Sequence, residues 1–209
     1  MPWYQRFVAK HLRHPTGMFG RRVARRMNAA NFKIYELALA NLEIDADDSL
    51  LDIGFGGGPA FRRLCGLVPQ GQVAGVDSSA TMLRMAATSF PDLIAAGRLA
   101  LQPGLFDRLP FQANRFDKIF TVNTIYFWDD PAIVLGEIVR VAKPGGSIAI
   151  GYRTPDAARR AQWQPHGFIY RSNDEIRTFL ETAGLAEISF AEQTSDGRDF
   201  ACALARKPS

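Results

Sequence analysis

The chain has 209 residues, of which 47% are hydrophobic and 22% are charged, and it carries a formal net charge of +4. This composition excludes a disordered or collagen-like chain, and no apolar run approaches the roughly 18 residues that a membrane-spanning helix needs. Two cysteines and three histidines, none of them in a metal-ligand spacing, predict no disulfide framework and no metal site. Because the N-terminal residues lack an apolar signal segment, we expect a cytoplasmic protein.

The basic residues are concentrated near the N-terminus. Residues 1–35 contain eight lysines and arginines and no acidic residue, whereas the remaining 17 basic and 21 acidic residues give the rest of the chain a charge of −4. We expect residues 1–45 to form a basic helical cap whose longer helix runs from about Phe19 to Leu42. The cap could close over a ligand as a lid, contact a membrane surface through residues 1–34, or bind nucleic acid. The lid is the favoured interpretation, and nucleic acid is the least favoured partner.

After residue 46, short apolar runs alternate with longer helical segments, a pattern typical of an α/β fold with a parallel sheet. Strands are predicted over Ser49–Ile53, Gln72–Val76, Arg98–Leu101, Lys118–Val122 and Ser147–Tyr152, and helices over Pro59–Val68, Ser79–Ser89, Pro131–Val141 and Asn173–Ala183. Two further strand-like runs, Glu187–Phe190 and Phe200–Ala205, flank an Asp-Gly pair and predict a C-terminal hairpin. The sequence therefore predicts a domain over residues 46–209 with a seven-stranded, mostly parallel sheet, in which the hairpin makes one strand antiparallel.

A glycine-rich turn follows the first predicted strand. Gly54, Gly56 and Gly58 lie between that strand and a helix, where glycines permit a tight turn and let a ligand approach backbone N–H groups. Asp77 ends the second predicted strand, 23 residues after Gly54, and an acid there can accept both hydrogen bonds from a ribose diol. Either of the two serines after it can cap the next helix. These features predict a nucleotide-like cofactor, either NAD or S-adenosylmethionine.

Four further features separate the two cofactors. Asp52 lies two residues before the first glycine, Leu109-Pro110-Phe111 precedes the fourth predicted strand, Lys143-Pro144-Gly145-Gly146 introduces the fifth, and the chain ends in the hairpin. With the glycine turn, these motifs resemble those of class I S-adenosylmethionine-dependent methyltransferases, especially the small-molecule type that includes quinone-biosynthesis methyltransferases. The resemblance covers about residues 46–207 and implies a Rossmann-like fold with an N-terminal helical cap.

The resemblance implies a role for each residue that matches the family's motifs. The glycine turn would hold the methionine part of S-adenosylmethionine, with Asp52 orienting the loop. Asp77 and Ser78 would bind the ribose, unless Asp77 serves only as a helix cap. Met82 would pack on the adenine, although a place in the core accounts for it almost as well. Asn123, at the end of the fourth predicted strand, would face the reacting methyl group.

The sequence departs from the family at Leu105, which stands where the family often has an acid that accepts the adenine amino group. The backbone N–H of Phe106 could still donate to the adenine ring, and either side chain could pack on the face of the ring. Asp107 comes two residues too late to replace the missing acid. We therefore expect weaker discrimination for adenine without loss of cofactor binding.

The methyl acceptor leaves little trace in a sequence, because a methyl sulfonium is already activated and mainly needs an aligned acceptor in a site that excludes water. The segment Asn123–Trp128 lacks the prolines typical of amide or adenine N-methylation, and no cysteine there suits cytosine C5 chemistry. A small-molecule acceptor remains. Its pocket is predicted at Tyr126, Trp128, Tyr152 and Tyr170, while simple packing explains the aromatic residues after Asn123 equally well. His166 and Tyr126 are the candidate bases, and an ordinary surface position is the alternative for His166.

Methyl transfer from S-adenosylmethionine to a small molecule is therefore the predicted function. Three alternatives stay open at this point. They are a non-catalytic S-adenosylmethionine-binding module, a methyltransferase acting on a membrane-associated lipid or quinone or on RNA recruited by the basic segment, and, least favoured, an NAD oxidoreductase.

Overall fold

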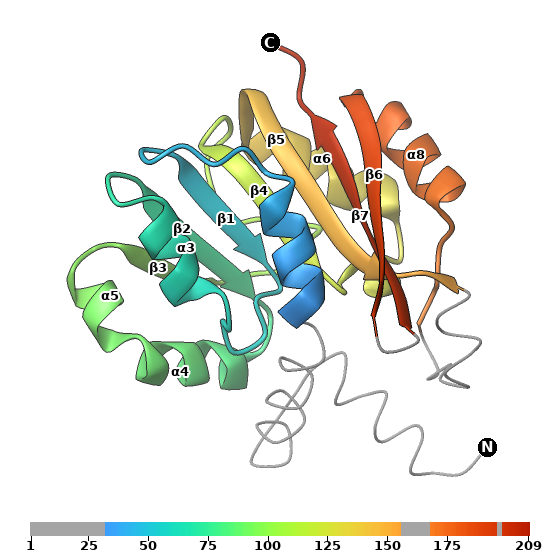
Figure 1. Cartoon of the computed structure of the whole chain (residues 1–209). Coiled ribbons are helices and arrows are strands. Elements are labelled where there is room, and N and C mark those ends of the chain that lie inside the picture. Colours follow the sequence, from blue (N-terminus) through green and yellow to red (C-terminus); the bar gives the residue numbers. More distant parts are fainter. Residues whose placement is uncertain (1–31, 156–167, 196–197) are drawn as a thin grey trace, which may run out of the picture.

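The computed structural model describes residues 32–155, 168–195 and 198–209, which form a seven-stranded sheet with helices on both faces (Figure 1). The strand order is β3-β2-β1-β4-β5-β7-β6. The strands are β1 (Ser49–Ile53), β2 (Gln72–Asp77), β3 (Leu99–Pro103), β4 (Phe116–Val122), β5 (Ala142–Arg153), β6 (Ala186–Ser195) and β7 (Arg198–Arg206). The first five strands pair in parallel, whereas β7 is antiparallel to both β5 and β6. The predicted mostly parallel sheet with a C-terminal hairpin is confirmed.

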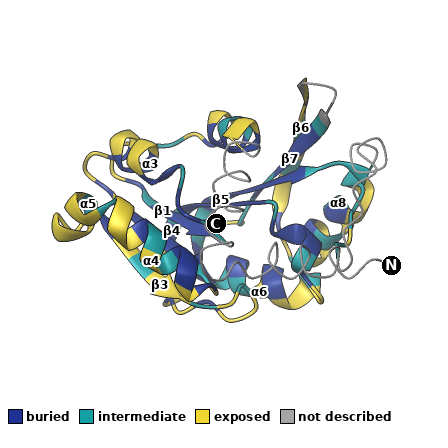
Figure 2. Ribbon diagram, turned by 90° about the horizontal axis from the view of Figure 1, so that it is seen from below, coloured by how far each residue is buried: buried dark blue, intermediate teal, exposed yellow. Residues whose placement is uncertain are grey.

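Two hydrophobic clusters cover the two faces of this sheet. The helices are the one over residues 32–40, α3 (Phe61–Leu67), α4 (Ala80–Ser89), α5 (Pro91–Ala95), α6 (Pro131–Val141) and α8 (Asn173–Thr182), with a short 3-10 helix η1 (Ile125–Phe127). The first helix, α3 and α4 pack on one face, and α6 and α8 pack on the other. Successive strand residues serve opposite faces, as Leu50 and Leu51 do. Figure 2 shows buried strands between helices whose outer sides are exposed.

The helix ends follow local signals in the sequence. Ser79 caps α4, and its hydroxyl accepts a backbone N–H at 3.4 Å. Asp130 caps α6, which begins at Pro131, and Ser172 forms a capping box at the start of α8. Gly184 follows the last turn of α8 with φ +78°, a conformation that glycine adopts without strain. The predicted helix boundaries at Ser79, Pro131 and Gly184 are therefore confirmed.

Some elements differ from the prediction. The sequence does not signal α5 or η1, because helices of five and three residues are too short to show a helical period. β5 begins at Ala142 instead of Ser147, since the strand continues through a Pro-Gly-Gly sequence that predicts a turn. The helix over residues 32–40 ends two residues before the predicted Leu42. Most of the basic segment lies in residues 1–31, outside the described residues, so the predicted cap is not described beyond that helix.

The helix over residues 32–40 packs closely on the sheet. Ile34 is 1% exposed, and Tyr35 meets Phe120 edge-on with ring centroids 6.2 Å apart. A Cβ atom at Gly151 of β5 would lie 2.7 Å from Ile34 Cγ2 and 3.3 Å from Val122 Cγ2. The missing side chain at position 151 therefore sets how near this helix can approach the sheet.

Replacing Gly151→Ala should lower the free energy of unfolding by about 1–3 kcal/mol, because the added methyl group overpacks the contact with Ile34. Chemical denaturation measures this loss. The matched control is Gly136→Ala, on α6, where an added Cβ would meet no atom within 4 Å. That variant should gain up to about 1 kcal/mol, since alanine is the better helix former. A Gly151→Ala variant as stable as the wild type would contradict the close packing.

Candidate functional site

The carboxyl ends of the parallel strands meet at one edge of the sheet, the lower edge in the view of Figure 1. β1 lies between β2 and β4, and the strand order runs in opposite directions on its two sides. In open α/β sheets, ligands bind in the crevice outside the strand ends at such a reversal. The segments that follow β1, β2 and β4 therefore form the candidate site.

The glycine turn after β1 depends on its glycines for backbone conformation and for space. Gly54, Gly56 and Gly58 have φ values of +71°, +54° and +70°, which residues with side chains rarely adopt. A Cβ atom at Gly54 would also lie 2.5 Å from Thr124 Cγ2, and one at Gly58 would lie 2.3 Å from the Phe61 ring. The turn predicted from the sequence is thus present at the edge of the site.

Asp77, at the end of β2, fastens this turn to the start of α4. One carboxylate oxygen accepts the Gly56 N–H at 2.9 Å, and the other accepts the Ser79 N–H at 2.8 Å. A carboxylate has about four acceptor positions, of which these two backbone N–H groups use two. Ser78 lies beside it and is exposed. The structure therefore brings Asp77, Ser78 and the glycine turn together, as the sequence predicts.

Asp52 is the most unusual group of the site. It lies at the end of β1, is fully buried, and neither carboxylate oxygen has a hydrogen-bond partner within the described part of the chain. Burial, and then the nearby charge of Asp77, raise the pKa of Asp52 well above its usual value. Burial, followed by the charges of Asp52 and Asp77, also raises the pKa of the Tyr35 phenol. A buried carboxylate is costly unless a cation or hydrogen-bond donors meet it.

Two threonines join the end of β4 to the glycine turn. The Thr121 hydroxyl donates to the Ile53 carbonyl at 2.7 Å, and the Thr121 and Thr124 hydroxyl oxygens lie 2.6 Å apart. Together with the close approach of Thr124 to Gly54, these contacts hold the two strand ends in register. Sequence reasoning did not identify either threonine or Tyr35 as part of the site, because single hydroxyl residues carry no motif.

Asn123 and Tyr126 connect the ends of β4 and β5. Asn123 has φ +58°, and its backbone N–H donates to the Gly151 carbonyl at 2.8 Å. The Tyr126 hydroxyl donates to Asn123 Oδ1 at 2.8 Å and accepts the Arg153 N–H at 2.5 Å. Burial raises the pKa of this phenol far above its usual value. Tyr126 thus uses both hydrogen-bonding directions of its hydroxyl to hold the Asn123 side chain.

The predicted aromatic pocket residues lie mainly in the core. Tyr126, Trp128 and Tyr152 are at most 3% exposed, and Tyr170 is half-buried. Tyr126 stacks on Phe168 and packs against Tyr170, with ring centroids 5.6 and 5.0 Å away. The packing alternative therefore accounts for the buried aromatic residues after Asn123. The other base candidate, His166, lies outside the described residues.

Of the residues predicted to contact adenine, Leu105 and Phe106 lie in the loop after β3 and Met82 lies in α4. Met82 is 1% exposed and belongs to the cluster under α3 and α4, whereas Leu105 is 50% exposed and Phe106 is half-buried. The loop over residues 104–111 begins with a hydrogen bond from the Gly104 N–H to the Asp77 carbonyl at 3.3 Å. It therefore starts beside the carboxylate that is predicted to bind the ribose.

A groove of about 580 Å³ opens beside the carboxyl end of β5, a volume typical of small-molecule sites. Its polar lining comes from the segment after β5, the start of α8 and the hairpin, and it includes Thr154, Asn173, Glu192, Gln193, Thr194 and Asp199. Asn173 accepts from the Tyr152 hydroxyl at 2.5 Å and donates to Glu192 Oε1 at 2.5 Å. Sequence reasoning missed the groove, because its walls come from segments far apart in the chain.

In the described part of the chain, no helix is both long enough and apolar enough to cross a membrane. Within the same ranges, no three histidine, cysteine or acidic residues gather in a way that could hold a metal ion.

A family model described as "Methyltransferase domain" matches residues 51–150, which extend from β1 through most of β5. Over 182 residues, the chain is 28% identical to the "uncharacterized methyltransferase YdaC" of Bacillus subtilis. That match covers 87% of this chain and 96% of its relative.

Solved structures share the fold. One is a chain from the complex between the Haloferax volcanii Trm112 methyltransferase activator and a methyltransferase, with a TM-score of 0.77, 22% identity, and coverage of 89% of this chain and 94% of that chain. Another is the Haemonchus contortus phosphoethanolamine N-methyltransferase 2, solved with phosphomonomethylethanolamine and S-adenosylhomocysteine. Its TM-score is 0.69 at 16% identity, with coverage of 85% of this chain and 53% of that chain.

Replacing Asp52→Asn should raise the free energy of unfolding of the ligand-free protein by at least about 1 kcal/mol above the folded pKa of Asp52, because a buried charge without a partner is removed. Burial and the Asp77 charge raise the folded pKa above the unfolded value, so the folded state binds this proton more tightly. Wild-type stability should therefore fall as the pH rises through the folded pKa, and this loss should be absent from the variant.

Denaturation at a series of pH values measures both effects. The control is Asp47→Asn, which removes an exposed carboxylate and should leave the pH dependence of stability unchanged. An Asp52→Asn variant less stable than the wild type at every pH would show that the carboxylate already has a favourable partner.

Proposed function

We propose that this chain, which belongs to the class I S-adenosylmethionine-dependent methyltransferases, transfers a methyl group from that cofactor to a polar small molecule. The family match, together with neighbours solved with S-adenosylmethionine or S-adenosylhomocysteine, confirms S-adenosylmethionine as the cofactor. We further propose a role for each residue of the site and a polar class of acceptor.

The unpartnered carboxylate of Asp52 is the observation that carries the proposal. S-adenosylmethionine brings an α-ammonium and a sulfonium, and a cation near Asp52 would compensate a charge that no described group compensates. Asp52 precedes the glycine turn by two residues, and the charge of Asp77 further raises its pKa. A neutral ligand would leave the cost of burying Asp52 in place, so this site favours a cationic one.

The residues of the site fit the parts of the cofactor in order. Asp52 and the glycine turn would hold the amino-acid end, where backbone N–H groups and a carboxylate meet. Asp77 and Ser78 would bind the ribose hydroxyls from the end of β2. Leu105, Phe106 and Met82 would enclose the adenine, and Asn123 would lie toward the methyl group.

The groove beside β5 supports a polar acceptor. Its lining offers carboxylate, amide and hydroxyl groups, whereas the aromatic side chains expected to line an apolar pocket are packed in the core. The Tyr126 hydroxyl, which bonds Arg153 next to the groove residue Thr154, is already committed in both directions. We therefore assign Tyr126 no proton transfer, and His166 stays a prediction for a base.

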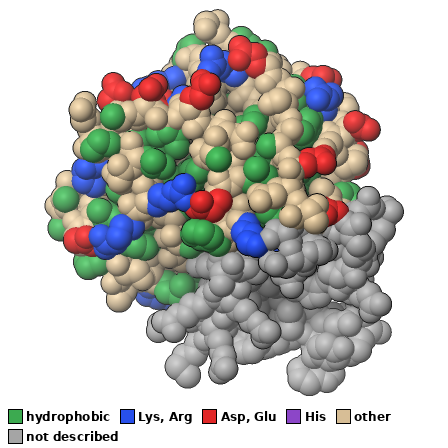
Figure 3. All heavy atoms as spheres, in the orientation of Figure 1, with side chains coloured by type: hydrophobic (Ala, Val, Ile, Leu, Met, Phe, Trp, Pro, Cys, Tyr) green, Lys and Arg blue, Asp and Glu red, His purple; other side chains and the backbone are tan. Residues whose placement is uncertain are grey.

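Surface charge also favours a small acceptor over nucleic acid. On the face of the described residues in Figure 3, lysine and arginine side chains are interspersed with aspartate and glutamate. Nucleic-acid interfaces use contiguous basic surfaces instead. The similarity to a chain from a complex with a methyltransferase activator keeps an activator partner for this chain as a competing proposal.

Titration calorimetry with S-adenosylmethionine and S-adenosylhomocysteine tests the cofactor site. Asp52→Asn should lower the affinity for both by about tenfold or more, which corresponds to the loss of one charge-assisted hydrogen bond. Wild-type affinity should rise with pH through the raised pKa of Asp52, because only the ionised carboxylate attracts the ammonium, and the variant should lack this rise. Asp47→Asn serves again as the control. Equal affinities for the wild type and Asp52→Asn would remove Asp52 from the site.

Transfer of tritium from methyl-labelled S-adenosylmethionine to a cell extract tests the acceptor class. We expect label in small molecules separated from the unreacted cofactor, and Glu192→Gln should reduce it about tenfold through a weaker acceptor contact. Glu187→Gln, at the other end of β6, is the matched control. Label in RNA or protein alone would contradict a small acceptor, and label in no fraction despite cofactor binding would favour a non-catalytic module.

A further inference from the structure

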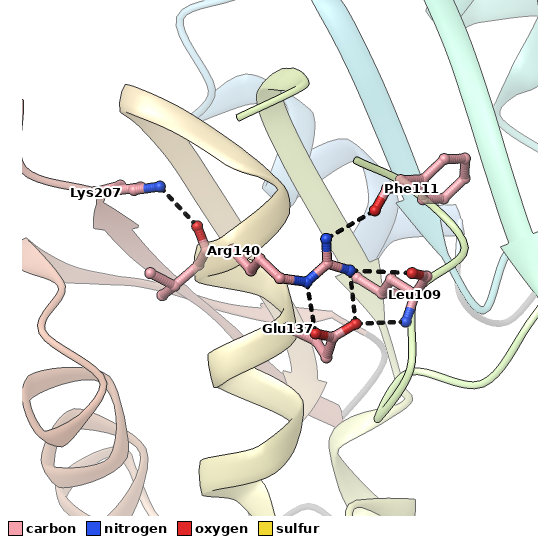
Figure 4. A network of polar contacts seen from close by, with 6 residues as sticks. Leu109, Phe111, Glu137, Arg140 and Lys207 are labelled. Atoms are coloured by element: carbon pink, nitrogen blue, oxygen red, sulfur yellow. Dashed lines mark hydrogen bonds and ion pairs between the residues drawn. The ribbon is translucent and has the colours of Figure 1, made fainter. Parts of the chain in front are cut away.

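We infer that Glu137 and Arg140 of α6 are positioning residues for the adenine side of the cofactor site. They hold the backbone of the 104–111 loop, which carries Leu105 and Phe106 (Figure 4). The inference rests on the proposed cofactor site and adds to it two residues that have no place in the glycine turn or its neighbours.

The two side chains make a bidentate pair and then reach the loop together. Arg140 Nε donates to Glu137 Oε1 at 2.7 Å, and Arg140 Nη2 donates to Glu137 Oε2 at 2.8 Å. Glu137 Oε2 also accepts the Leu109 N–H at 2.7 Å. Arg140 donates to the Leu109 carbonyl at 3.1 Å and to the Phe111 carbonyl at 2.7 Å. Three backbone groups of the loop are therefore satisfied by one ion pair, as Figure 4 shows.

The charges of this pair are firmly held. The hydrogen bond from Arg140 lowers the pKa of Glu137, against a smaller opposing effect of burial, and Glu137 in turn raises the pKa of Arg140. Both groups stay ionised across the neutral range, where charge-assisted hydrogen bonds are the stronger kind. The side chains of Leu109 and Phe111 are buried, so loss of the pair would leave their backbone groups without these partners.

Within the described residues, few other backbone hydrogen bonds hold the loop. The Gly104 N–H bonds the Asp77 carbonyl at its start, and the Arg108 N–H bonds the Leu105 carbonyl at 3.2 Å in a tight turn. A Cβ at Gly104 would lie 2.8 Å from Pro110 Cδ, so the two ends of the loop also pack on each other. The loop is thus tied to β2 at one end and to α6 at the other.

The loop's backbone matters here because of Leu105. This position has no acid to accept the adenine amino group, so recognition of the base falls to the backbone N–H of Phe106 and to apolar contact with the ring. A side chain can adjust to a displaced loop by changing rotamer, but a backbone donor cannot. Adenine recognition should therefore depend on the residues that fix the loop, Glu137 and Arg140.

The test compares S-adenosylhomocysteine with S-inosylhomocysteine, in which ring N1 carries a hydrogen and opposes a backbone N–H donor. Calorimetry on the wild type should show tighter binding of the adenosyl ligand. In Arg140→Met, the affinity for S-adenosylhomocysteine should fall about tenfold, and the preference for adenine over hypoxanthine should fall toward one. Arg140→Lys keeps the charge but cannot reach all three partners of the guanidinium. Its preference for adenine should lie between those of the wild type and Arg140→Met.

The matched control is Arg115→Met. The Arg115 guanidinium lies over the rings of Phe111, the last residue of the loop, and Phe116, 5.2 and 5.3 Å from their centroids. The Arg115→Met substitution should leave the base preference intact. If Arg140→Met fails to fold, Glu137→Gln replaces it, because this amide keeps the shape of the pair and should reduce the preference in part.

An unchanged preference in folded Arg140 and Glu137 variants would overturn the inference, and so would an equal loss in Arg115→Met. A wild-type protein that binds neither ligand would instead overturn the proposed cofactor site. The two failures are therefore distinguishable in one set of titrations.

Discussion

The Asp52 carboxylate has no partner in the described fold, and the surrounding structure keeps it that way. It ends a central strand with a neighbouring strand on each side, so water does not reach it. Among the described residues, Asp77 and Tyr35 interact electrostatically with it; both are acids, and Asp77 adds to the unfavourable charge. A fold selected for stability alone would place a neutral or apolar side chain there. The carboxylate is consistent with a site that meets a cation only when its ligand is bound.

The remaining polar contacts of the site hold separate elements in fixed relation. Asp77 binds the glycine turn to α4, Thr121 binds β4 to β1, and Tyr126 binds the ends of β4 and β5. Glu137 and Arg140 extend the same principle to the loop after β3. Each tie satisfies backbone groups that a loop cannot satisfy by itself. Transfer of a sulfonium-activated methyl carbon to an acceptor atom needs alignment of the acceptor with the breaking C–S bond above all, so such chemistry needs rigid loops.

The sequence predicts the conformation of the glycine turn and the position of Asp77 well, because the determinants of both are local. Gly54 and Gly58 are required by positive φ and by the lack of room for a Cβ, and both constraints act within a few residues of a strand end. Asp77 follows from its place at the end of the next strand. The strands and the hairpin also follow from local apolar runs and turn residues. The predicted start of β5 at Ser147 was wrong, because a proline and two glycines near the beginning of the strand are typical of a turn.

The acceptor side could not be predicted in the same way, since its determinants are distant in the chain. Tyr126 and Tyr152 look like pocket residues because they lie near the carboxyl ends of strands. In the structure, however, the rings of Phe168 and Tyr170 pack against Tyr126, and the Tyr152 hydroxyl donates to the Asn173 amide. The open groove is formed instead by polar groups of α8 and the hairpin.

This division limits what resemblance to quinone-biosynthesis enzymes can say. The shared motifs lie at β1, β2, β4 and the start of β5, where the proposed cofactor site is, whereas the groove is built from residues after β5. The contacts that join the two parts include the hydrogen bond of the Tyr126 hydroxyl with Arg153 and that of the Tyr152 hydroxyl with Asn173. A polar acceptor held by Glu192 or Asn173 would therefore be aligned with the cofactor through the ends of β4 and β5. The acceptor can change between relatives through α8 and the hairpin while the cofactor motifs stay the same.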